Sequence, residues 1–460
     1  MSTLMPALVP GAAGPDGAPA MLGVLGGGQL ARMFVHAAQA LGYRSAVLDP
    51  DPASPAGRVS HLHLQAAYDD EPALAQLARQ CVAVTTEFEN VPAASLAWLA
   101  AKLPVAPMAP AVAICQQRAA EKAHFQRCGV PCAPYAVLHD AASLRAVDET
   151  LFPAILKTAQ LGYDGKGQIA VATRAGLEDA WRALHGVPCV LEKRLALRSE
   201  ISVIVARAAD GQWVHLPAQR NLHRDGILAV TEVPAPEVAA EAAAQAVQWA
   251  ARLAAAMDYV GVLCVEFFQL SDGTLLANEM APRPHNSGHY SIDACDLSQF
   301  ELQVRCMAGL PLAAPRQHSA AVMLNLLGEL WFDGEASVTP PWQRVLALPG
   351  TKLHLYGKTA PRRGRKMGHL TIVAADAAAA RRVALEAAAC LGLPPFWASG
   401  TAPASRAGKE QALMPTMAHA AEAAVAALSG QARSLPQLAM AFGKILKRVG
   451  DPGDGLVVPF

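Results

Sequence analysis

Two glutamates on either side of a tight polar turn constrain the fold of this chain more than any other feature. Glu266 begins the run Glu-Phe-Phe-Gln-Leu, a Ser-Asp-Gly turn follows at 271–273, and a second run ends at Glu279. Strand, turn and strand predict a β-hairpin that carries both carboxylates on one face. Close like charges are costly without a proton or cation between them, and carboxylate oxygens suit Mg²⁺ held jointly with substrate phosphates. The hairpin therefore predicts a magnesium site.

Length and composition set the outer limits. A chain of 460 residues is long enough for about three domains. Its 38 basic and 38 acidic residues cancel, which argues against nucleic acid or a membrane surface as a partner. No apolar run reaches the roughly 18 residues needed to span a bilayer. The nine cysteines contain no Cys-x-x-Cys pair, which favours free thiols in a reducing cytoplasm over a zinc site.

Composition and periodicity divide the chain into five parts. Residues 1–20 are rich in Ala, Pro and Gly and are expected to be a disordered leader. Residues 21–115 open with a β-α-β pattern, and residues 116–310 contain the hairpin and end at a predicted helix. Residues 311–403 hold three more strands and a helix, and residues 404–460 read as an additional helical tail.

The N-terminal β-α-β unit has a glycine turn. Gly26-x-Gly28-x-x-Ala31, with an acid about twenty residues further on, satisfies the dinucleotide-binding fingerprint. A nicotinamide-dependent dehydrogenase is therefore one alternative, and a turn that only packs a helix on a sheet is another. Glu87 follows a later buried strand. Because ligands in open α/β sheets lie beyond the carboxyl ends of strands, Glu87 is expected to face the same crevice as Gln29.

A lysine and a glycine loop come next. Lys157 ends a predicted strand, and the loop at 161–168 contains three glycines and a second lysine. Such a loop can fold its backbone amides over phosphates. A solvated lysine at a strand end is the alternative for Lys157 alone. Further on, the backbone of residues 192–195 is a candidate for gripping a nucleotide base and Glu200 for binding its ribose.

Three segments allow a less specific interpretation. Glu192 and Arg194 alone suit a surface salt bridge. The stretch 221–226 reads as a turn in a polar loop, where His223 would be solvated. The basic stretch from Lys358 to Lys366 lies between two predicted strands; it suits a phosphate monoester, which arginine binds in a bidentate manner, or a solvated turn.

Together these features resemble the ATP-grasp superfamily, and within it the N5-carboxyaminoimidazole ribonucleotide synthase family of purine biosynthesis. The similarity runs from about Met21 to Gly400. The motifs that carry it are Gly28-Gln29-Leu30, Glu87-Phe88-Glu89-Asn90, Gly162-Tyr163-Asp164-Gly165-Lys166-Gly167-Gln168, Asn221-Leu222-His223-Arg224-Asp225-Gly226 and Ala281-Pro282-Arg283-Pro284-His285-Asn286-Ser287-Gly288-His289.

The resemblance implies a multidomain α/β and α+β protein. Its ATP-grasp fold would follow an N-terminal Rossmann-like (pre-ATP-grasp) domain, and a small β-rich C-terminal domain would complete the ATP and substrate sites. The residues implied to bind ATP are Arg118, Lys157, Gly162, Tyr163, Asp164, Gly165, Lys166, Gly167, Gln168, Glu192, Lys193, Arg194, Leu195, Glu200, His223, Asn278 and Glu279. The implied ligands of two Mg²⁺ ions are Glu266 and Glu279.

The remaining implied site residues bind the other substrates. Bicarbonate, or the carboxyphosphate made from it, would meet Arg283, His285 and Asn286, with Tyr163 and Asp164 on a closing loop as further catalytic residues. The residues implied to bind 5-aminoimidazole ribonucleotide are Gln29, Leu30, Glu87, Lys358, Arg365 and Lys366. The basic turn is one residue longer than the family's usual spacing, so the choice among Arg362, Arg363 and Arg365 stays open.

The implied reaction is ATP-driven carboxylation of the exocyclic amine of 5-aminoimidazole ribonucleotide in a homodimeric enzyme. His285, Asp164 and the released phosphate remain alternatives for the group that takes the amine proton. The formate-dependent glycinamide ribonucleotide transformylase is the nearest alternative in the superfamily. Its motifs read Gly-Glu-Leu and His-Asp-Thr-Gly, whereas this chain has Gln29-Leu30 and His285-Asn286-Ser287-Gly288.

Overall fold

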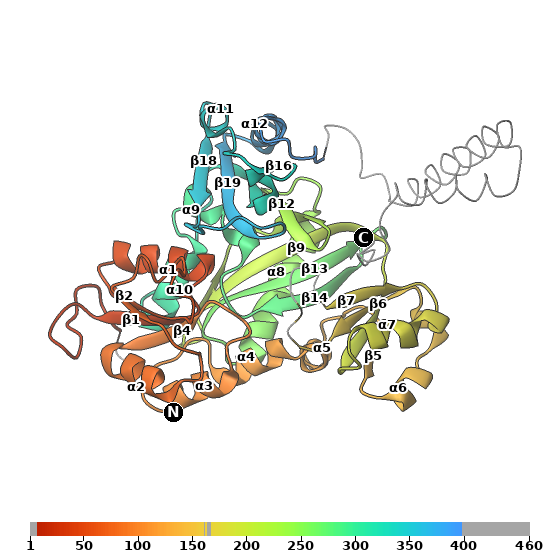
Figure 1. Ribbon diagram of the computed structural model, residues 1–460, viewed down its shortest axis with the longest axis horizontal. Coiled ribbons are helices and arrows are strands. Elements are labelled where there is room, and N and C mark those ends of the chain that lie inside the picture. The colour runs from red at the N-terminus through yellow and green to blue at the C-terminus, as the bar shows by residue number, and fades with distance from the viewer. Residues whose placement is uncertain (1–6, 161, 163–166, 398–460) are drawn as a thin grey trace, which may run out of the picture. The chain divides into compact units, whose positions relative to one another are not determined.

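The computed structural model describes residues 7–160, 162 and 167–397 (Figure 1). Met1–Pro395 form one compact unit and Phe396–Phe460 a second, of which only the first two residues are described. The helices predicted in the tail therefore lie outside the described residues. The following paragraphs concern the first unit.

The N-terminal part is a parallel sheet in the order β3, β2, β1, β4. Its elements are β1 (Met21–Leu25), α1 (Gln29–Ala40), β2 (Arg44–Leu48), β3 (Leu62–Leu64), α2 (Glu71–Gln80), β4 (Ala83–Thr86), α3 (Ala93–Ala100) and α4 (Ala109–Gln116). Every residue of β1 is buried, as expected for a strand with both faces covered. Leu30 and Phe34 of α1 pack on one face, and Leu74 and Leu77 of α2 belong to the core on the other.

A small antiparallel sheet follows in the order β5, β8, β6, β7. Its strands and accompanying helices are α5 (Arg118–Arg127), β5 (Tyr135–Leu138), α6 (Ala141–Arg145), β6 (Ala154–Thr158), β7 (Gln168–Val171), α7 (Leu177–Ala183) and β8 (Cys189–Lys193). β6 and β8 are paired so that Lys157 lies opposite Val190. The sheet thereby places Lys157 and Glu192 close enough for an ion pair.

The largest sheet joins strands from the central and C-terminal parts of the chain. Its path runs β14, β13, β9, β11, β12, β15, β19, β18, and β10 pairs with β9. Its strands are β9 (Leu197–Arg207), β10 (Trp213–His215), β11 (Gln219–Arg224), β12 (Ile227–Val233), β13 (Gly261–Leu270), β14 (Leu275–Ala281), β15 (Ala320–Leu327), β18 (Thr351–Leu355) and β19 (Lys366–Ala374). Because β12 pairs with β15, the C-terminal strands continue the central sheet.

Helices cover this sheet, and side chains alternate between its faces. They are α8 (Ala240–Ala256), α9 (Ser291–Ala294), α10 (Gln299–Ala308), α11 (Trp342–Leu346) and α12 (Ala377–Cys390), with a two-stranded ribbon of β16 (Phe332–Asp333) and β17 (Ala336–Ser337). Val203 and Val205 of β9 pack in the core that contains α8, whereas Ile204 packs in the core that contains α10.

The buried helix α10 joins the N-terminal sheet to the large sheet (Figure 1). The Gln303 side-chain amide donates to the Thr85 hydroxyl at 2.8 Å and accepts from the Val262 backbone N–H at 2.6 Å. A buried amide that is satisfied on both sides fixes these two sheets against each other. The carboxyl end of β4 thereby faces the hairpin of β13 and β14.

Two sequence-based predictions of local structure are wrong. Residues 7–20 are not a disordered leader: the Leu8 amide donates to Ala308 O at 2.8 Å, and Asp16 pairs with Arg44 at 2.6 Å. These partners belong to distant segments that composition does not reveal. The stretch 221–226 is not a polar loop, since β11 and β12 form a hairpin around the Asp225-Gly226 turn, with φ positive at both turn residues.

No described helix has both the length and the apolar character that a membrane crossing requires.

Asp293, His354 and His369 place potential metal-ligand atoms within 4.8 Å of one another. The two imidazole rings are stacked, with centroids 4.4 Å apart and planes inclined by 11°. A histidine binds a metal in the plane of its ring, so two parallel stacked rings cannot both direct a lone pair at one ion. Asp293 Oδ2 instead contacts His354 Nε2 at 2.7 Å, and the Tyr356 hydroxyl contacts His369 Nδ1 at 2.9 Å. The group is a packing contact.

Candidate active site

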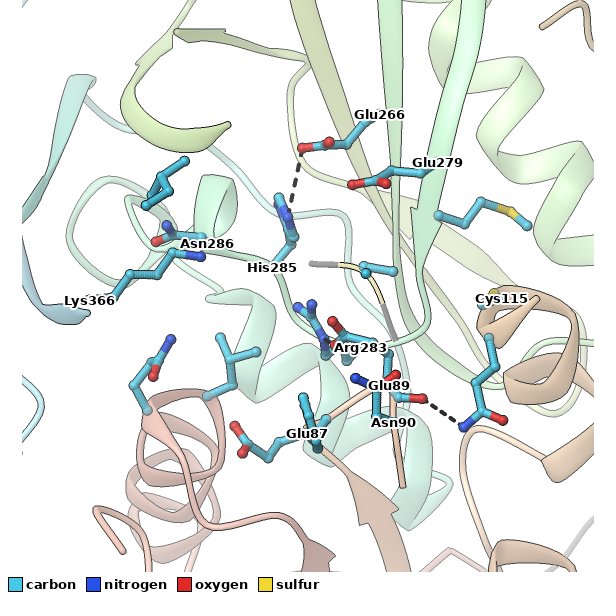
Figure 2. Close-up of a pocket in the computed structure, with 18 of the residues that line it drawn as sticks. Glu87, Glu89, Asn90, Cys115, Glu266, Glu279, Arg283, His285, Asn286 and Lys366 are labelled. Atoms are coloured by element: carbon cyan, nitrogen blue, oxygen red, sulfur yellow. Dashed lines mark hydrogen bonds and ion pairs between the residues drawn. The ribbon is translucent and has the colours of Figure 1, made fainter. Parts of the chain in front are cut away.

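Two adjoining cavities lie beside the hairpin. The larger, about 590 Å³, opens between the N-terminal sheet and the hairpin, and the smaller, about 270 Å³, lies over β9 and β11. We call them the substrate cavity and the nucleotide cavity. They share six lining residues, which are Arg118, Glu266, Glu279, His285, Asn286 and Lys366. Of the predicted catalytic residues, His285 and Asn286 therefore lie where the two cavities meet, beside the carboxylate pair (Figure 2).

The predicted carboxylate pair is confirmed. Glu266 of β13 lies directly opposite Glu279 of β14. Burial raises the pKa of Glu266 to about 7, and the negative charge of Glu279 adds to that shift. Burial also acts on Glu279, but Arg118 and Lys157 outweigh it and lower the pKa of that carboxyl group. One proton or a cation would relieve this pair.

The oxygen atoms around the pair fit a hard cation. Among the described residues, Glu266 Oε1 and Asn278 Oδ1 are buried without a hydrogen-bond partner. Buried acceptors that lack a donor are costly, and a divalent cation satisfies them. Arg118 Nη1 contacts Glu279 Oε2 at 3.2 Å, which leaves the other carboxylate oxygen available. The donor set therefore suits Mg²⁺.

A buried ion cluster supports the nucleotide cavity. Lys157 Nζ lies 3.1 Å from Glu192 Oε2, and Lys122 Nζ lies 3.4 Å from the same oxygen. Lys122 is fully buried and also donates to Asn278 O at 2.8 Å. The predicted alternatives, a solvated Lys157 and a surface salt bridge from Glu192 to Arg194, are wrong. Lys122 was missed, although its position four residues after Arg118 places it on the same face of α5.

His223 and Glu200 form the far wall of the nucleotide cavity. His223 Nδ1 lies 2.5 Å from Glu200 Oε2. Burial lowers the pKa of His223, but the hydrogen bond and charge of Glu200 outweigh burial and raise it to about 9. The expectation of a solvated histidine is therefore wrong. That expectation treated the polar residues at 221–226 as a loop. In the structure β11 carries them, and its side chains Asn221 and His223 line the nucleotide cavity.

Other residues implied for ATP are only partly described. Gly162 lines the substrate cavity, Gln168 lines the nucleotide cavity, and Gly167 adopts a positive φ of 70° beside them. The loop residues Tyr163, Asp164, Gly165 and Lys166 lie outside the described residues. Lys193, Arg194 and Leu195 at the end of β8 do not line the described nucleotide cavity. Their binding roles remain predictions.

The glycine turn of the N-terminal sheet has its amides occupied. Glu87 accepts from the Gly28 amide at 2.8 Å and from the Ala31 amide at 3.1 Å, while Asp49 accepts from the Gly27 amide at 2.7 Å. A dinucleotide would need these amides for its pyrophosphate and the acid for its ribose. Here Glu87 and Asp49 already accept the hydrogen bonds of these amides, and Asp49 is thereby engaged as well. The structure therefore does not support the dehydrogenase alternative.

Arg283 links the N-terminal sheet to the segment after the hairpin. Its Nε is in contact with Glu89 Oε2, and both residues are largely buried. Burial opposes the charge on Glu89, but Arg283 outweighs burial and lowers the pKa of that carboxyl group. The sequence predicted a site role for Arg283, whereas Glu89 entered only as part of the motif Glu87-Phe88-Glu89-Asn90. Their ion pair was missed because 194 residues separate them.

His285 and Asn286 follow Arg283 along the cavity wall. His285 Nε2 lies 3.7 Å from Glu266 Oε1. Burial and the neighbouring charge of Arg283 hold the pKa of His285 well below its ordinary value. Both amide atoms of Asn286 are buried without a protein partner among the described residues. A neutral imidazole and an open amide therefore face the junction of the cavities.

The opposite wall of the substrate cavity is cationic. The turn between β18 and β19 contributes Lys358, Arg362, Arg363, Arg365 and Lys366 to the lining, together with Gln29 and Leu30 from α1. Lys358 Nζ contacts Gln29 Oε1 at 2.7 Å and Lys366 O at 2.7 Å. The predicted residues are therefore brought together from two ends of the chain, 329 residues apart.

Known proteins resemble successive parts of this chain. A ribonucleotide synthetase preATP-grasp domain matches residues 20–116, an ATP-grasp domain matches 123–300, and a phosphoribosylaminoimidazole carboxylase C-terminal domain matches 321–383. These matches confirm the predicted ATP-grasp architecture with its N-terminal and C-terminal additions.

Individual relatives agree with the family models. The N5-carboxyaminoimidazole ribonucleotide synthase of Brucella melitensis is 42% identical over 76% of this chain and 95% of its own length, and that of Bacillus subtilis is 39% identical over 77% and 91%. A crystal structure of an N5-carboxyaminoimidazole ribonucleotide synthetase with ADP has a TM-score of 0.77 at 36% identity and covers 84% of this chain and 98% of that chain. The Aspergillus clavatus enzyme, solved with ADP and 5-aminoimidazole ribonucleotide, has a TM-score of 0.73 at 32% identity and covers 81% and 99%. The chain belongs to the N5-carboxyaminoimidazole ribonucleotide synthase family.

Proposed function

We propose that this protein uses ATP and bicarbonate to carboxylate the exocyclic amine of 5-aminoimidazole ribonucleotide in purine biosynthesis. The observation that carries the proposal is the shared wall of the two cavities, where the carboxylate pair adjoins His285 and Asn286. Among the described residues, this shared wall is where a group that leaves a nucleotide in one cavity would meet an acceptor in the other. The formate-dependent transformylase is not favoured, because the relatives belong to the carboxylating family.

Each cavity suits one substrate. The nucleotide cavity offers Lys157 and Arg118 for phosphates, and Glu200 as an acceptor for ribose hydroxyls. The basic turn from Lys358 to Lys366 suits the phosphate monoester of the ribonucleotide, and Gln29 offers an amide near it. With its phosphate at the basic turn, the ribonucleotide would direct its imidazole towards Glu87 and the junction, which line the same cavity.

Chemistry at the junction is phosphoryl transfer, in which positioning and neutralisation of charge supply most of the rate acceleration. Mg²⁺ ions held by Glu266 and Glu279 would supply charge neutralisation when bound. Lys157 and Arg118 keep cationic groups beside the same phosphates. Bicarbonate would lie between Arg283 and Asn286, whose N–H groups donate to its oxygens. Attack of a bicarbonate oxygen on the γ-phosphoryl group breaks its bond to ADP and gives carboxyphosphate. Carboxyphosphate then loses its phosphate, and the amine takes up the carboxyl group as a carbamate and gives up one proton.

The test is phosphate release from ATP with each co-substrate alone and with both. We expect release to require 5-aminoimidazole ribonucleotide and bicarbonate together. Glycinamide ribonucleotide with formate is the control pair for the nearest relative. If this pair stimulates release and the first pair does not, the assignment is wrong.

Three further properties are part of the proposal. All nine cysteines are free, which supports a reducing compartment such as the cytoplasm. The limits of the matched family models support domains at 21–115, 116–310 and 311–403. The homodimer implied by the family is measured directly by light scattering.

A further inference from the structure

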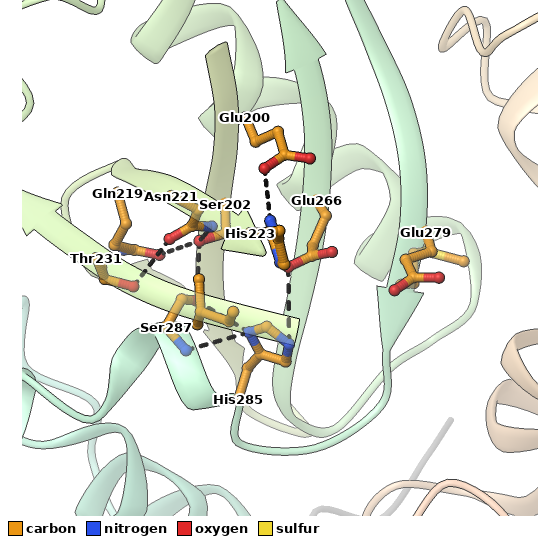
Figure 3. Close-up of polar contacts among 12 residues, drawn as sticks. Glu200, Ser202, Gln219, Asn221, His223, Thr231, Glu266, Glu279, His285 and Ser287 are labelled. Carbon is orange, nitrogen blue, oxygen red and sulfur yellow. Dashed lines mark hydrogen bonds and ion pairs between the residues drawn. The ribbon is translucent and has the colours of Figure 1, made fainter. Parts of the chain in front are cut away.

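A chain of buried side chains runs behind His285, away from the cavities (Figure 3). His285 Nδ1 lies 2.9 Å from Ser287 Oγ, which lies 2.8 Å from Ser202 Oγ, which lies 2.9 Å from Gln219 Oε1. Ser202, Gln219 and Ser287 are fully buried. We call these three the hydroxyl chain. None of them was a candidate from the sequence, and none contributes to the lining of either cavity.

The far end of the hydroxyl chain is an acceptor. The Gln219 amide nitrogen contacts the carbonyl oxygen of Pro217, and it also lies 3.5 Å from the Tyr290 hydroxyl. Because a carbonyl oxygen cannot donate, the amide atom beside it must be the nitrogen. Gln219 therefore presents its oxygen to Ser202. That oxygen can only accept, so the single hydrogen of the Ser202 hydroxyl is used in this contact.

The direction of the remaining contacts follows. Asn221 donates to Ser202 Oγ at 2.8 Å and is itself held by the Thr231 hydroxyl at 2.9 Å. Ser202 has no hydrogen left for Ser287, so the Ser287 hydroxyl donates to Ser202. Ser287 then has no hydrogen left for His285. The contact at 2.9 Å is a hydrogen bond only if His285 Nδ1 carries a hydrogen and donates it.

Two other groups contact the end of the hydroxyl chain that lies at His285. The Ser287 amide lies 3.3 Å from His285 Nδ1, and accepting from it would require a bare Nδ1. With a bare Nδ1, the hydroxyl hydrogens of Ser202 and Ser287 would be the two hydrogens for three contacts of 2.8–2.9 Å, and one of these contacts would have none. The contact from the Ser287 amide is longer, at 3.3 Å, and therefore weaker. The Cys264 thiol is also a partner of Ser287, and its S–H can donate to the Ser287 hydroxyl oxygen.

The open side of the imidazole faces the junction. With the hydrogen on Nδ1, Nε2 is a bare acceptor, and its nearest polar contact among the described residues is Glu266 Oε1 at 3.7 Å. A protonated Nε2 would have no acceptor within hydrogen-bond distance there, so the cavity side agrees with the direction set behind the ring. Asn286 offers one donor and one acceptor and suits any small carboxylate. A bare Nε2 can only accept a hydrogen bond, so it selects more strongly than Asn286 for an anion that carries a hydroxyl.

Bicarbonate and formate differ at this point. Each has carboxylate oxygens for N–H donors, but bicarbonate also has a hydroxyl, where formate has only a C–H. A site that holds a buried acceptor for this hydroxyl leaves the acceptor unpaired when formate binds, and an unpaired buried group weakens binding by roughly 10- to 100-fold.

We propose that the hydroxyl chain holds His285 as the Nδ1–H tautomer, so that Nε2 accepts the hydroxyl of bicarbonate and the site discriminates against formate. Gln219, Ser202 and Ser287 are thus positioning residues. This inference rests on the proposed function for the identity of the anion, whereas the tautomer itself does not depend on it.

The first test measures the tautomer without substrates. The full-length protein is labelled with ¹⁵N-histidine, and the His285 signals are assigned by their loss in His285→Gln. We expect Nδ1 to show the shift of a protonated ring nitrogen and Nε2 that of a bare one. A wild-type protein with a protonated Nε2 and a bare Nδ1 would overturn the inference, whatever its activity.

The second test reverses the hydrogen bond between Ser287 and His285. Ser202→Ala removes the acceptor of the Ser287 hydroxyl, which is then free to donate to Nδ1 and to move the ring hydrogen to Nε2. We expect kcat with bicarbonate to fall about 10- to 100-fold and the preference for bicarbonate over formate, measured as stimulated phosphate release, to fall by a similar factor. The KM for ATP should stay within about twofold. Asn221, which lines the nucleotide cavity, loses its contact with Ser202 but keeps its contact with Thr231.

Thr231→Val is the matched control. Thr231 is buried in the same network, but it donates to Asn221 and does not set the direction of the hydroxyl chain. It should leave the tautomer and the anion preference unchanged. Equal loss of preference in both variants would mean that general packing, and not direction, matters. A protein with the expected tautomer that bicarbonate does not stimulate refutes the proposed function and the anion specificity with it.

Discussion

The ion cluster under the nucleotide cavity gives the sharpest prediction about stability. Glu192 is 3% exposed and lies between the ammonium groups of Lys122 and Lys157. Burial would raise the pKa of this carboxyl group, but the two lysines outweigh burial and lower it from 4.5 to about 2. A difference of about 2.5 pKa units corresponds to about 3 kcal/mol of stabilisation at neutral pH.

The substitution Glu192→Gln tests this value. It keeps the shape of the side chain and leaves two buried cations without their anion, and breaking buried pairs of this kind costs about 3–5 kcal/mol. We therefore expect the free energy of unfolding to fall by about 3 kcal/mol at pH 7. The pKa of Glu192 is lowered in the folded state, so its stabilisation is present above about pH 4.5 and disappears as the pH falls towards about 2. The difference between the two proteins should shrink over this range.

Urea unfolding followed by circular dichroism measures the effect, provided that the slope m is the same for both proteins. Glu178→Gln is the control, because its side chain is 74% exposed and its ion pair with Arg182 lies on the surface of α7. The control should change stability by less than about 0.5 kcal/mol. If Glu192→Gln costs no more than the control, the buried cluster does not stabilise the fold and the reasoning is wrong.

Three other changes test separate parts of the site. Glu279→Gln should abolish phosphate release while the circular dichroism spectrum is retained, because the carboxylate pair loses its cation; activity near that of wild type would contradict the metal assignment. Gly28→Ala builds a Cβ 2.7 Å from Glu87 Oε1, so the Glu87 side chain must shift. The KM for 5-aminoimidazole ribonucleotide should then rise roughly 10-fold, while the KM for ATP stays unchanged. Equal changes in both KM values would refute a local effect. Glu200 raises the pKa of His223 to about 9. The melting-temperature difference between wild type and His223→Ala should therefore be largest below about pH 6.5 and fall to a constant packing contribution above about pH 9; a difference independent of pH would exclude the ion pair.

Local pattern predicted the hairpin well. Glu266 and Glu279 are separated by one turn, so the strand pattern predicted that they lie close together on the hairpin. Their pairing depends on a register shift between Glu266 and Phe267, which the pattern did not show; without it, Asn278 would lie opposite Glu266. The strand that carries Lys157 was predicted from a short apolar run, and the helix that begins at Gln29 was predicted from the glycine turn before it. These features depend on residues that lie close together in the sequence.

Features that depend on distant partners were missed. The pattern around Glu192 shows Arg194 nearby, but not Lys122, which reaches the same carboxylate from a helix 70 residues earlier. Residues 7–20 resembled a leader because their partners, such as Ala308, lie in another part of the chain. The hydroxyl chain was invisible because the direction of a hydrogen bond is set by all its members together.

The proposed function requires that bicarbonate is phosphorylated at the junction of the two cavities. The most direct measurement uses bicarbonate labelled with ¹⁸O in the presence of ATP and 5-aminoimidazole ribonucleotide, followed by mass analysis of the released phosphate. Attack of a bicarbonate oxygen on the γ-phosphoryl group predicts that one labelled oxygen is transferred to phosphate in each turnover. Released phosphate without the label, at a normal rate of turnover, would contradict the account.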